Sequence, residues 1–275
     1  MVDPIELSAA GCNFKMYTHS NEVLSNQLRT NGYHSRNDLL LFNEFLKPGS
    51  YFVDVGSNIG WHSIIASLLV GNSGKVFSFE PEPNNGEIFK QNILLNNLNN
   101  VELTECAVLD KEQLIDFYLH PDNFGDHSIA ESTHLRSYIK SEQQRITIPA
   151  RRIDTVISPD DFLKIDLIKM DIQGCESAAL AGCSELFKIK KPPIIIEYSP
   201  AHMYSAKFSP FEIFAFIDLA EYIPFKIFSD SEEKTIDDCC KMLTINDLLI
   251  ETATIKDTFT AIDLLLLPKT HPMLN

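Results

Sequence analysis

The segment DVGSNIG, residues 54–60, places an acid, two glycines and small polar side chains next to one another. The apolar residues 51–53 before it indicate a buried strand, and residues 61–70 after it indicate a helix. Ligands of open parallel sheets bind at such strand-to-helix turns. Glycine lets the backbone turn sharply and approach a ligand, and the first N–H groups of the helix can bind it. We therefore expect a nucleoside-like ligand at this turn.

Glu80 supports a nucleoside at this position. It follows a second predicted strand, residues 75–79, and lies about 20 residues beyond Gly60, the spacing at which a carboxylate reaches ribose hydroxyl groups. Pro81 comes directly after it and is included in the predicted ribose contact.

The turn also distinguishes between nucleotide ligands. A dinucleotide-binding turn carries further glycines where this chain has Asn58 and Trp61, so the backbone is not shaped for a pyrophosphate. Asp54 would repel a diphosphate but attract a cation. S-adenosylmethionine carries both a sulfonium and an α-ammonium group, and it is the cofactor that we predict. An ordinary tight connection followed by a chance acid is the alternative. The predicted cofactor-binding turn comprises Asp54, Gly56, Ser57, Asn58 and Gly60.

A second polar block follows another predicted strand, which begins near residue 166. Asp171 lies at the carboxyl end of this strand, which places a carboxylate over the methyl or hydride position of a bound cofactor. Lys169 lies two residues earlier, on the same sheet face, where it offers Asp171 a charge partner. Glu176 opens the next helix, where the helix dipole or a functional role would each explain an acid. Glu197, which ends the following strand, is a third carboxylate at this edge.

Methyl transfer to an alcohol indicates which catalytic groups to expect. The sulfonium is a good electrophile, so an enzyme mainly has to align the acceptor and exclude water. A general base would take the hydroxyl proton, and Asp171 and His127 are the candidates. Asp171 could instead hold the methionine ammonium group or the substrate, and His127 could be a bystander. The sequence shows no metal cluster, although Asp171, Glu197 and His127 could hold a divalent ion if they converge. The polar segment 121–144 around His127 is long for a simple connection, and we interpret it as a lid or substrate loop.

Strand and helix signals alternate along the chain and indicate one α/β domain over residues 48–275. Residues 1–47 form an irregular, partly helical lead-in, expected to pack on the cleft. A strand over residues 101–104 ends near Cys106 and Ala107, which we expect to face the adenine. The other predicted elements are helices over residues 38–46, 84–96, 176–187 and 210–222 and strands over residues 114–119, 145–153, 193–198, 225–228 and 260–267, the last two as an antiparallel pair.

Composition excludes several classes of protein. The 275 residues carry a net charge of −15, which argues against general affinity for nucleic acids, since a basic surface supplies most of that binding. The longest apolar run, residues 264–267, is too short to span a bilayer, and residues 1–6 lack the basic start of a secretion signal. The six cysteines form no CxxC pair, so reduced thiols are expected, with neither a zinc site nor a disulfide framework. We therefore expect a cytoplasmic protein, of open oligomeric state.

Taken together, four motifs resemble the FkbM family of S-adenosylmethionine-dependent methyltransferases over roughly residues 35–267. The resemblance implies the class I methyltransferase fold, an α/β Rossmann-like, seven-stranded, mostly parallel sheet with an antiparallel last strand and helices on both faces. It also implies methyl transfer, typically to a hydroxyl oxygen of a sugar or secondary metabolite. The turn, Glu80 and the Lys169–Asp171 pair then correspond to the cofactor turn, the ribose clamp and the strand-four site. The motifs are residues 54–60, 79–81, 168–176 and 194–197.

One residue departs from the family pattern. Gln173 stands where the family usually has Glu, so a negative charge near the cleft is missing. This difference puts in doubt an acid–base or metal-binding role for position 173. A small molecule or glycan is the expected acceptor. A methyltransferase acting on protein or another macromolecule, and an inactive cofactor-binding module, are the alternatives.

Overall fold

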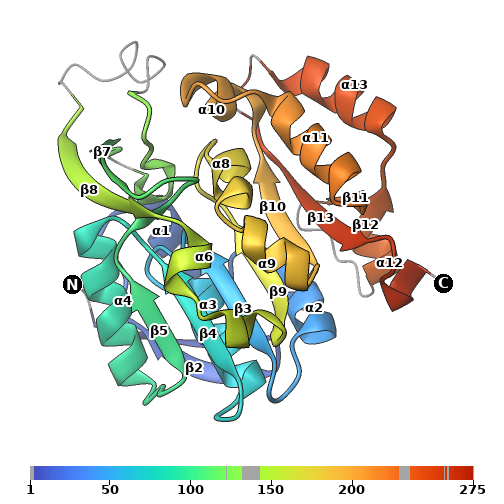
Figure 1. Ribbon diagram of the computed structural model, residues 1–275. Helices are drawn as coiled ribbons and strands as arrows, with labels where there is room; N and C mark the ends of the chain where they lie inside the picture. Colours follow the sequence, from blue (N-terminus) through green and yellow to red (C-terminus); the bar gives the residue numbers. More distant parts are fainter. Residues whose placement is uncertain are drawn as a thin grey trace.

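The computed structural model describes residues 3–121, 123–131, 143–228, 236–256, 258 and 260–274. Its centre is an eight-stranded sheet with the order β12-β11-β13-β10-β9-β3-β4-β5 (Figure 1). The strands are β3 (Tyr51–Val55), β4 (Lys75–Phe79), β5 (Val101–Thr104), β9 (Ile165–Met170), β10 (Ile194–Tyr198), β11 (Tyr222–Ile227), β12 (Cys240–Met242) and β13 (Ile262–Pro268).

The pairing directions match the predicted class I sheet. Strands β5, β4, β3, β9 and β10 pair in parallel, and β13 runs antiparallel to both β10 and β11. The expected seven strands with an antiparallel last strand are therefore present. The short β12 adds an eighth strand at the β11 edge. Its three residues are too few to show an alternating pattern in the sequence, which explains why it was missed.

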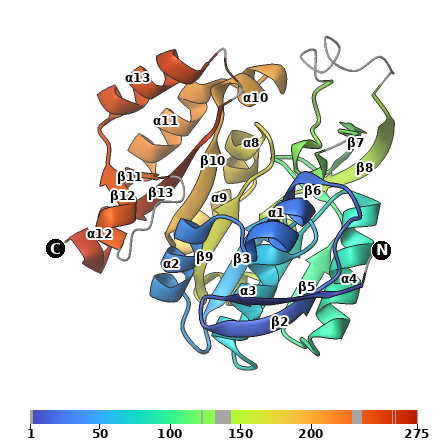
Figure 2. The ribbon, with the colours of Figure 1, turned by 180° about the vertical axis from the view of Figure 1, so that it is seen from behind.

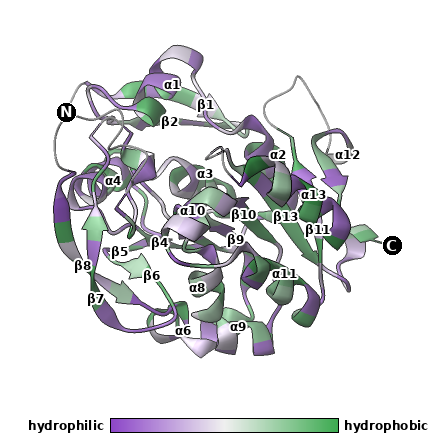
Figure 3. Cartoon of the chain, turned by 90° about the horizontal axis from the view of Figure 1, so that it is seen from above, coloured by the Kyte–Doolittle hydropathy of each residue, from purple (hydrophilic) through white to green (hydrophobic). Residues whose placement is uncertain are grey.

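Helices cover both faces of the sheet (Figures 1 and 2). Figure 3 shows the N-terminal hairpin and α1 on one side of the sheet and α8, α9 and α11 on the other. No helix in the described ranges is long and apolar enough to cross a membrane. The helices are α1 (Val23–Asn31), α2 (Arg36–Phe45), α3 (Trp61–Val70), α4 (Pro83–Leu95), α6 (Ile153–Val156), α7 (Pro159–Phe162), α8 (Glu176–Ala181), α9 (Ser184–Ile189), α10 (Pro200–Ser205), α11 (Pro210–Leu219), α12 (Ile236–Cys239) and α13 (Ile245–Ile255), with 3-10 turns η1 (Phe124–Asp126) and η2 (Pro272–Leu274).

Alternation along the strands divides the core between the two faces. On β9, Ile168 packs with α8 and α11, whereas Leu167 packs with α2 and α3 on the opposite face. Lys169 shares the face of Leu167, and Asp54 on β3 shares that of Phe52. The α2–α3 face therefore carries the charged groups of the central strands, next to the carboxyl ends where ligands bind.

The N-terminal lead-in contains a hairpin that the sequence did not predict. Strands β1 (Ile5–Ala9) and β2 (Cys12–Met16) pair antiparallel, with alternate residues buried, across a turn that places Ala10 and Gly11 at positive φ. Asn92 of α4 connects this region to the cofactor turn, since its side-chain amide donates to the carbonyl oxygens of both Tyr17 and Ile59. The alternation and Gly11 were the available signals.

A separate three-stranded sheet holds β6 (Ala107–Val108), β8 (Arg145–Arg151) and β7 (Gln113–Tyr118), in that order. The strands predicted over residues 114–119 and 145–153 are thus confirmed, with β8 ending at Arg151. Half of the predicted lid over residues 121–144 lies outside the described residues, at 122 and 132–142.

Two predicted helices end earlier than expected. The helix expected to reach residue 187 is divided into α8, which ends at Ala181, and α9, which begins at Ser184. A side chain at Gly182 between them would lie 2.3 Å from the carbonyl oxygen of Leu109. The carboxylate of Asp154 then accepts the backbone N–H groups of residues 185 and 186 and starts α9. The helix predicted over residues 210–222 ends at Leu219, and Tyr222 begins β11. The antiparallel pair at the end of the chain is confirmed as β11 and β13, although β12 and α13 intervene.

Candidate functional site

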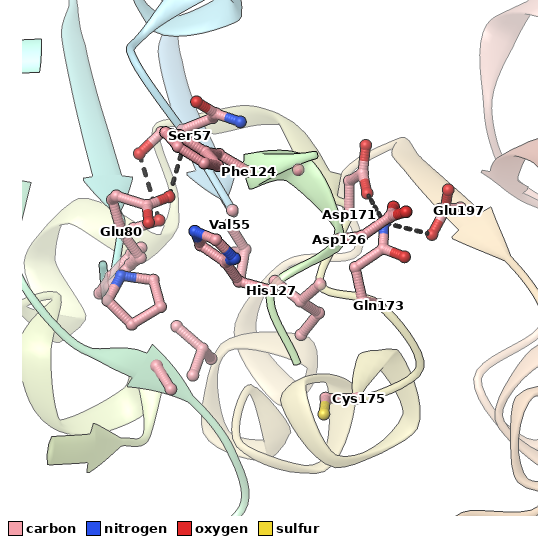
Figure 4. Close-up of a pocket in the computed structure, with 18 of the residues that line it drawn as sticks. Val55, Ser57, Glu80, Phe124, Asp126, His127, Asp171, Gln173, Cys175 and Glu197 are labelled. Carbon is pink, nitrogen blue, oxygen red and sulfur yellow. Dashed lines mark hydrogen bonds between the residues drawn. The ribbon is translucent and has the colours of Figure 1, made fainter. Parts of the chain in front are cut away.

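A pocket opens at the carboxyl ends of the central strands, where the turns after β3, β4 and β9 meet (Figure 4). Two predicted residues, Asp54 and Gly60, are not among its lining residues. The predicted residues that do line it are Gly56, Ser57, Asn58, Glu80, Pro81, Cys106, Ala107, His127, Lys169 and Asp171.

The glycines of the cofactor turn are required by the protein's own packing. A Cβ atom at Gly56, whose φ is +89°, would lie 2.0 Å from the carbonyl oxygen of Asp171. A Cβ atom at Gly60, whose φ is +92°, would lie 2.2 Å from the ring of Phe89. The glycines therefore admit the β9 loop and α4, and Gly56 also lines the pocket, where approach of a ligand to its backbone stays a prediction.

The backbone N–H groups of this turn already have acceptors. Those of Gly56 and Ser57 donate to the carbonyl oxygen of Phe79, and that of Asn58 donates to Glu80 Oε2 at 2.8 Å. The next two donate to acceptors within the turn, Asn58 Oδ1 and the carbonyl oxygen of Ser57. Residues 56–60 thus present no N–H to a phosphate, which agrees with the predicted exclusion of a dinucleotide.

Asp54 lies beneath the turn. Its side chain is buried, and its Oδ2 accepts a hydrogen bond of 2.5 Å from the hydroxyl of Ser63 on α3. The same hydroxyl lies 2.7 Å from that of Ser78 on β4. Burial raises the pKa of Asp54. Asp54 therefore connects α3 to the sheet and is not among the residues that line the pocket.

Glu80 connects the turns after β3 and β4. Its carboxylate accepts the N–H groups of Asn58 and Glu82, at 2.8 and 2.9 Å, and the side-chain amide of Asn85 at 3.4 Å. A carboxylate has about four acceptor sites, so about one is left for a ribose hydroxyl. Burial raises the pKa of Glu80 to about 7.

A hydrogen-bonded group of side chains forms the other end of the pocket. Lys169 Nζ lies 3.2 Å from Asp171 Oδ2, which confirms the expected contact. The amide nitrogen of Gln173 donates to Asp171 Oδ1 at 3.2 Å and to Glu197 Oε2 at 3.1 Å (Figure 4). A glutamate at position 173 would place a third carboxylate here, whereas the amide of Gln173 stabilises both neighbours. Its buried Oε1 has no partner among the described residues and is available to a ligand donor.

The two carboxyl groups joined by Gln173 differ in protonation. Against the effect of burial, the positive charge of Lys169 lowers the pKa of Asp171. Burial and the negative charge of Asp171 raise the pKa of Glu197 well above its usual range. These effects favour the ionised form of Asp171 and the protonated form of Glu197.

His127 lies between Glu80 and Asp171 in the pocket (Figure 4). Its Nδ1 accepts the backbone N–H of His120 at 2.8 Å, and its ring stacks on Phe124. Burial lowers the pKa of His127 to about 4, so the ring is neutral and its hydrogen is on Nε2. This arrangement favours His127 as a hydrogen-bond donor and argues against its expected role as a base.

The possible convergence of His127 with Asp171 and Glu197 on a metal is not found. Within the described ranges, no group of three histidine, cysteine or acidic side chains is arranged to hold an ion.

The lowered pKa of His127 predicts a pH-dependent stability. Its pKa in the folded protein is about 4, below the ordinary value, so stability is fully present above about pH 6.5 and is lost as the pH falls toward 4. When the pH is lowered from 7 to 5, we expect the free energy of unfolding of His127→Gln to fall by about 1–2 kcal/mol less than that of the wild type. Urea unfolding at both pH values measures this difference, and equal losses in the two proteins would contradict it.

Residues before the turn form a wall of the pocket that the sequence did not predict in detail. Val23, Leu24 and Gln27 of α1 line it, together with His34 and with His62 near the start of α3. The position of His62 just after the turn was an available signal. The contribution of α1 depends on tertiary packing, so no local pattern in the sequence indicated it.

The residues present fit S-adenosylmethionine. The side chains beyond β5, which include Cys106 and Ala107, are apolar and line the pocket, where they would contact the adenine, and burial raises the pKa of the Cys106 thiol to about 12. Glu80 would hold the ribose. Asp171 and the partnerless Oε1 of Gln173 offer acceptors to a cationic methionine group.

Known proteins support this assignment. The family model "Methyltransferase FkbM domain" matches residues 54–224, more than half of the chain. The 2-O-methyltransferase NoeI of Sinorhizobium fredii is 31% identical over 173 residues, which cover 58% of this chain and 68% of NoeI. Methyltransferase sdnD of Sordaria araneosa is 23% identical over 163 residues, 51% of this chain and 62% of sdnD.

A crystal structure of methyltransferase FkbM from Methylobacillus flagellatus aligns with 74% of this chain at 18% identity and a TM-score of 0.47. The alignment spans 46% of that chain. The chain therefore belongs to the FkbM family of methyltransferases, and S-adenosylmethionine is its cofactor.

Proposed function

We propose that this enzyme transfers the methyl group of S-adenosylmethionine to a hydroxyl oxygen of a sugar or small-molecule metabolite. The observation that carries the proposal is the polar lining of the pocket, in which His34 and His62 accompany the hydrogen-bonded group of Asp171, Gln173 and Glu197. Carboxyl, amide and imidazole groups are suited to bonding several hydroxyl groups at once. The name of the relative NoeI, a 2-O-methyltransferase, is consistent with such an acceptor.

Each end of the pocket has a distinct task in this proposal. The bound cofactor supplies a methyl group on a positively charged sulfur. Glu80 holds the ribose, and Asp171 holds the cationic end of the cofactor or a hydroxyl group of the acceptor. The wall formed by α1, His34 and His62 excludes water and aligns the acceptor. Alignment is the main requirement for attack on a sulfonium. The net charge of −15 supports a small or neutral acceptor over a nucleic acid.

A transfer screen tests the proposal. The protein is incubated with methyl-labelled S-adenosylmethionine and a panel of methyl glycosides, with denatured protein and RNA as competing acceptors. We expect label in a glycoside, in a linkage that survives mild alkali, because an ether resists alkali whereas a methyl ester does not. Asp116→Asn, which changes an exposed ion pair on β7, serves as the control and should retain activity. Label confined to protein or RNA, or its loss in alkali, would contradict the proposal.

A further inference from the structure

His34 lies in the connection between α1 and α2, outside the residues 54–224 matched by the family model. Its side chain lines the pocket. The indole N–H of Trp61 donates to its carbonyl oxygen at 3.0 Å, and the next residue, Ser35, has left-handed backbone angles. The backbone around His34 is thus fixed by α3, directly after the cofactor turn.

The hydrogen bonds of His34 select the opposite tautomer from that of His127. Nδ1 of His34 lies 2.8 Å from the side-chain oxygen of Gln27 on α1. A carbonyl oxygen only accepts, so Nδ1 carries the hydrogen and Nε2 keeps its lone pair. His34 therefore presents a proton acceptor, whereas His127 presents a donor.

Titratable groups from three elements surround His34. They are Asp38 on α2, His62 on α3, whose ring centroid is 6.0 Å away, and Lys169 and Asp171 at the end of β9. Burial, His62 and Lys169 lower the pKa of His34 to about 4, while the two acids oppose this effect. The ring is neutral at physiological pH, and a positive charge formed on it would face two carboxylates.

We propose that His34 is the general base that takes the proton of the acceptor hydroxyl, an inference that rests on the proposed function. The acceptor oxygen forms a bond to the methyl carbon while the carbon–sulfur bond breaks and leaves its electron pair on sulfur. The hydroxyl proton moves to Nε2 of His34. One positive charge disappears from sulfur as another forms on the imidazole, so the net charge of the pocket is unchanged.

The other two candidates are less suited to this step. Both oxygens of the Asp171 carboxylate already accept hydrogen bonds, Oδ2 from Lys169 and Oδ1 from Gln173. Nδ1 of His127 is occupied by a backbone N–H. Behind His34, Asp38 Oδ2 lies 3.5 Å from His62 Nε2, which places an acid–imidazole pair next to the developing imidazolium.

Turnover and binding of His34→Ala test the proposal together. With the glycoside found in the screen, turnover should fall by about 100-fold, the usual effect of a general base, and added imidazole should restore part of it. Affinity for S-adenosylhomocysteine should stay within about twofold, as expected of a residue that meets only the acceptor side. His34→Gln keeps a polar side chain without a base and provides a second variant. His271→Ala, at the opposite end of the sheet beyond β13, is the matched control.

A second experiment, on ligand binding, needs no acceptor. Sinefungin carries an amine where the cofactor carries its methylsulfonium, so we expect His34→Ala to weaken sinefungin by about tenfold while S-adenosylhomocysteine binds normally. Unchanged turnover, or equal losses of affinity for both ligands, would overturn the role of His34. Failure of the wild type to bind either ligand or to methylate any glycoside would instead overturn the proposed function, and with it this inference.

Discussion

Asp171→Asn should slow methyl transfer by roughly 100-fold or more while the protein stays folded. The substitution keeps the shape of the side chain and the contact with Gln173, but it removes the negative charge that, in the proposed function, holds the cationic end of the cofactor or a hydroxyl group of the acceptor. Lys169 would lose its nearest partner, at 3.2 Å, yet the charges of Asp38, Asp54 and Asp263 still act on it. We therefore expect the loss in rate to exceed the loss in stability.

Single-turnover transfer and thermal unfolding of the same preparation separate the two effects. Asp116→Asn is the matched control, because it makes the same chemical change in an exposed ion pair with Arg145. Full turnover by Asp171→Asn together with a lowered melting temperature would show that Asp171 is only half of a structural ion pair.

Glu80→Ala should weaken the binding of S-adenosylhomocysteine by about 10- to 100-fold, the range for a hydrogen bond to a charged group. Part of this loss comes from the turn, because Glu80 also accepts the N–H groups of Asn58 and Glu82. Glu80→Gln, which keeps the size of the side chain, should lose less. Calorimetric titration measures both, with the exposed Glu87→Gln on α4 as the control. Affinities equal to that of the wild type would exclude Glu80 from the ribose site.

The raised pKa of Glu80 adds a pH dependence to this binding. Its folded value of about 7 lies above the ordinary value, so folding favours the protonated carboxyl, and that contribution to stability is lost as the pH rises through 7. Ribose hydroxyl groups donate to the ionised form. Cofactor affinity should therefore increase between pH 6 and pH 8 in the wild type and change less in Glu80→Gln.

Local patterns explain how much of the fold could be predicted. Strands β4 and β5 begin and end where predicted, because each is a run of strand-forming residues bounded by turn residues. The contact between Lys169 and Asp171 follows from the two-residue period of a strand. The hairpin β1–β2 and the edge strand β12 were missed, since short alternating segments give weak signals.

The sequence indicated which residues line the pocket, but not the hydrogen bonds that these residues form. Spacing placed Glu80 and Asp171 at the pocket, but it could not show that Phe79 and Glu80 occupy the N–H groups of the turn. The tautomers of His34 and His127 depend on partners that are distant in sequence or set by loop conformation. Hydrogen-bond partners of this kind arise only when the elements pack.

Nuclear magnetic resonance of the transferred methyl carbon tests the central claim most directly. The wild-type protein is mixed with S-adenosylmethionine labelled at its methyl carbon and with the glycoside panel, and the labelled signal is followed over time. The proposed function predicts that the sulfonium methyl signal is replaced by an ether methyl signal, at a rate that falls sharply in Asp171→Asn. A methyl signal that stays on sulfur with every glycoside, or that moves to nitrogen or to an ester, would contradict transfer to a hydroxyl oxygen.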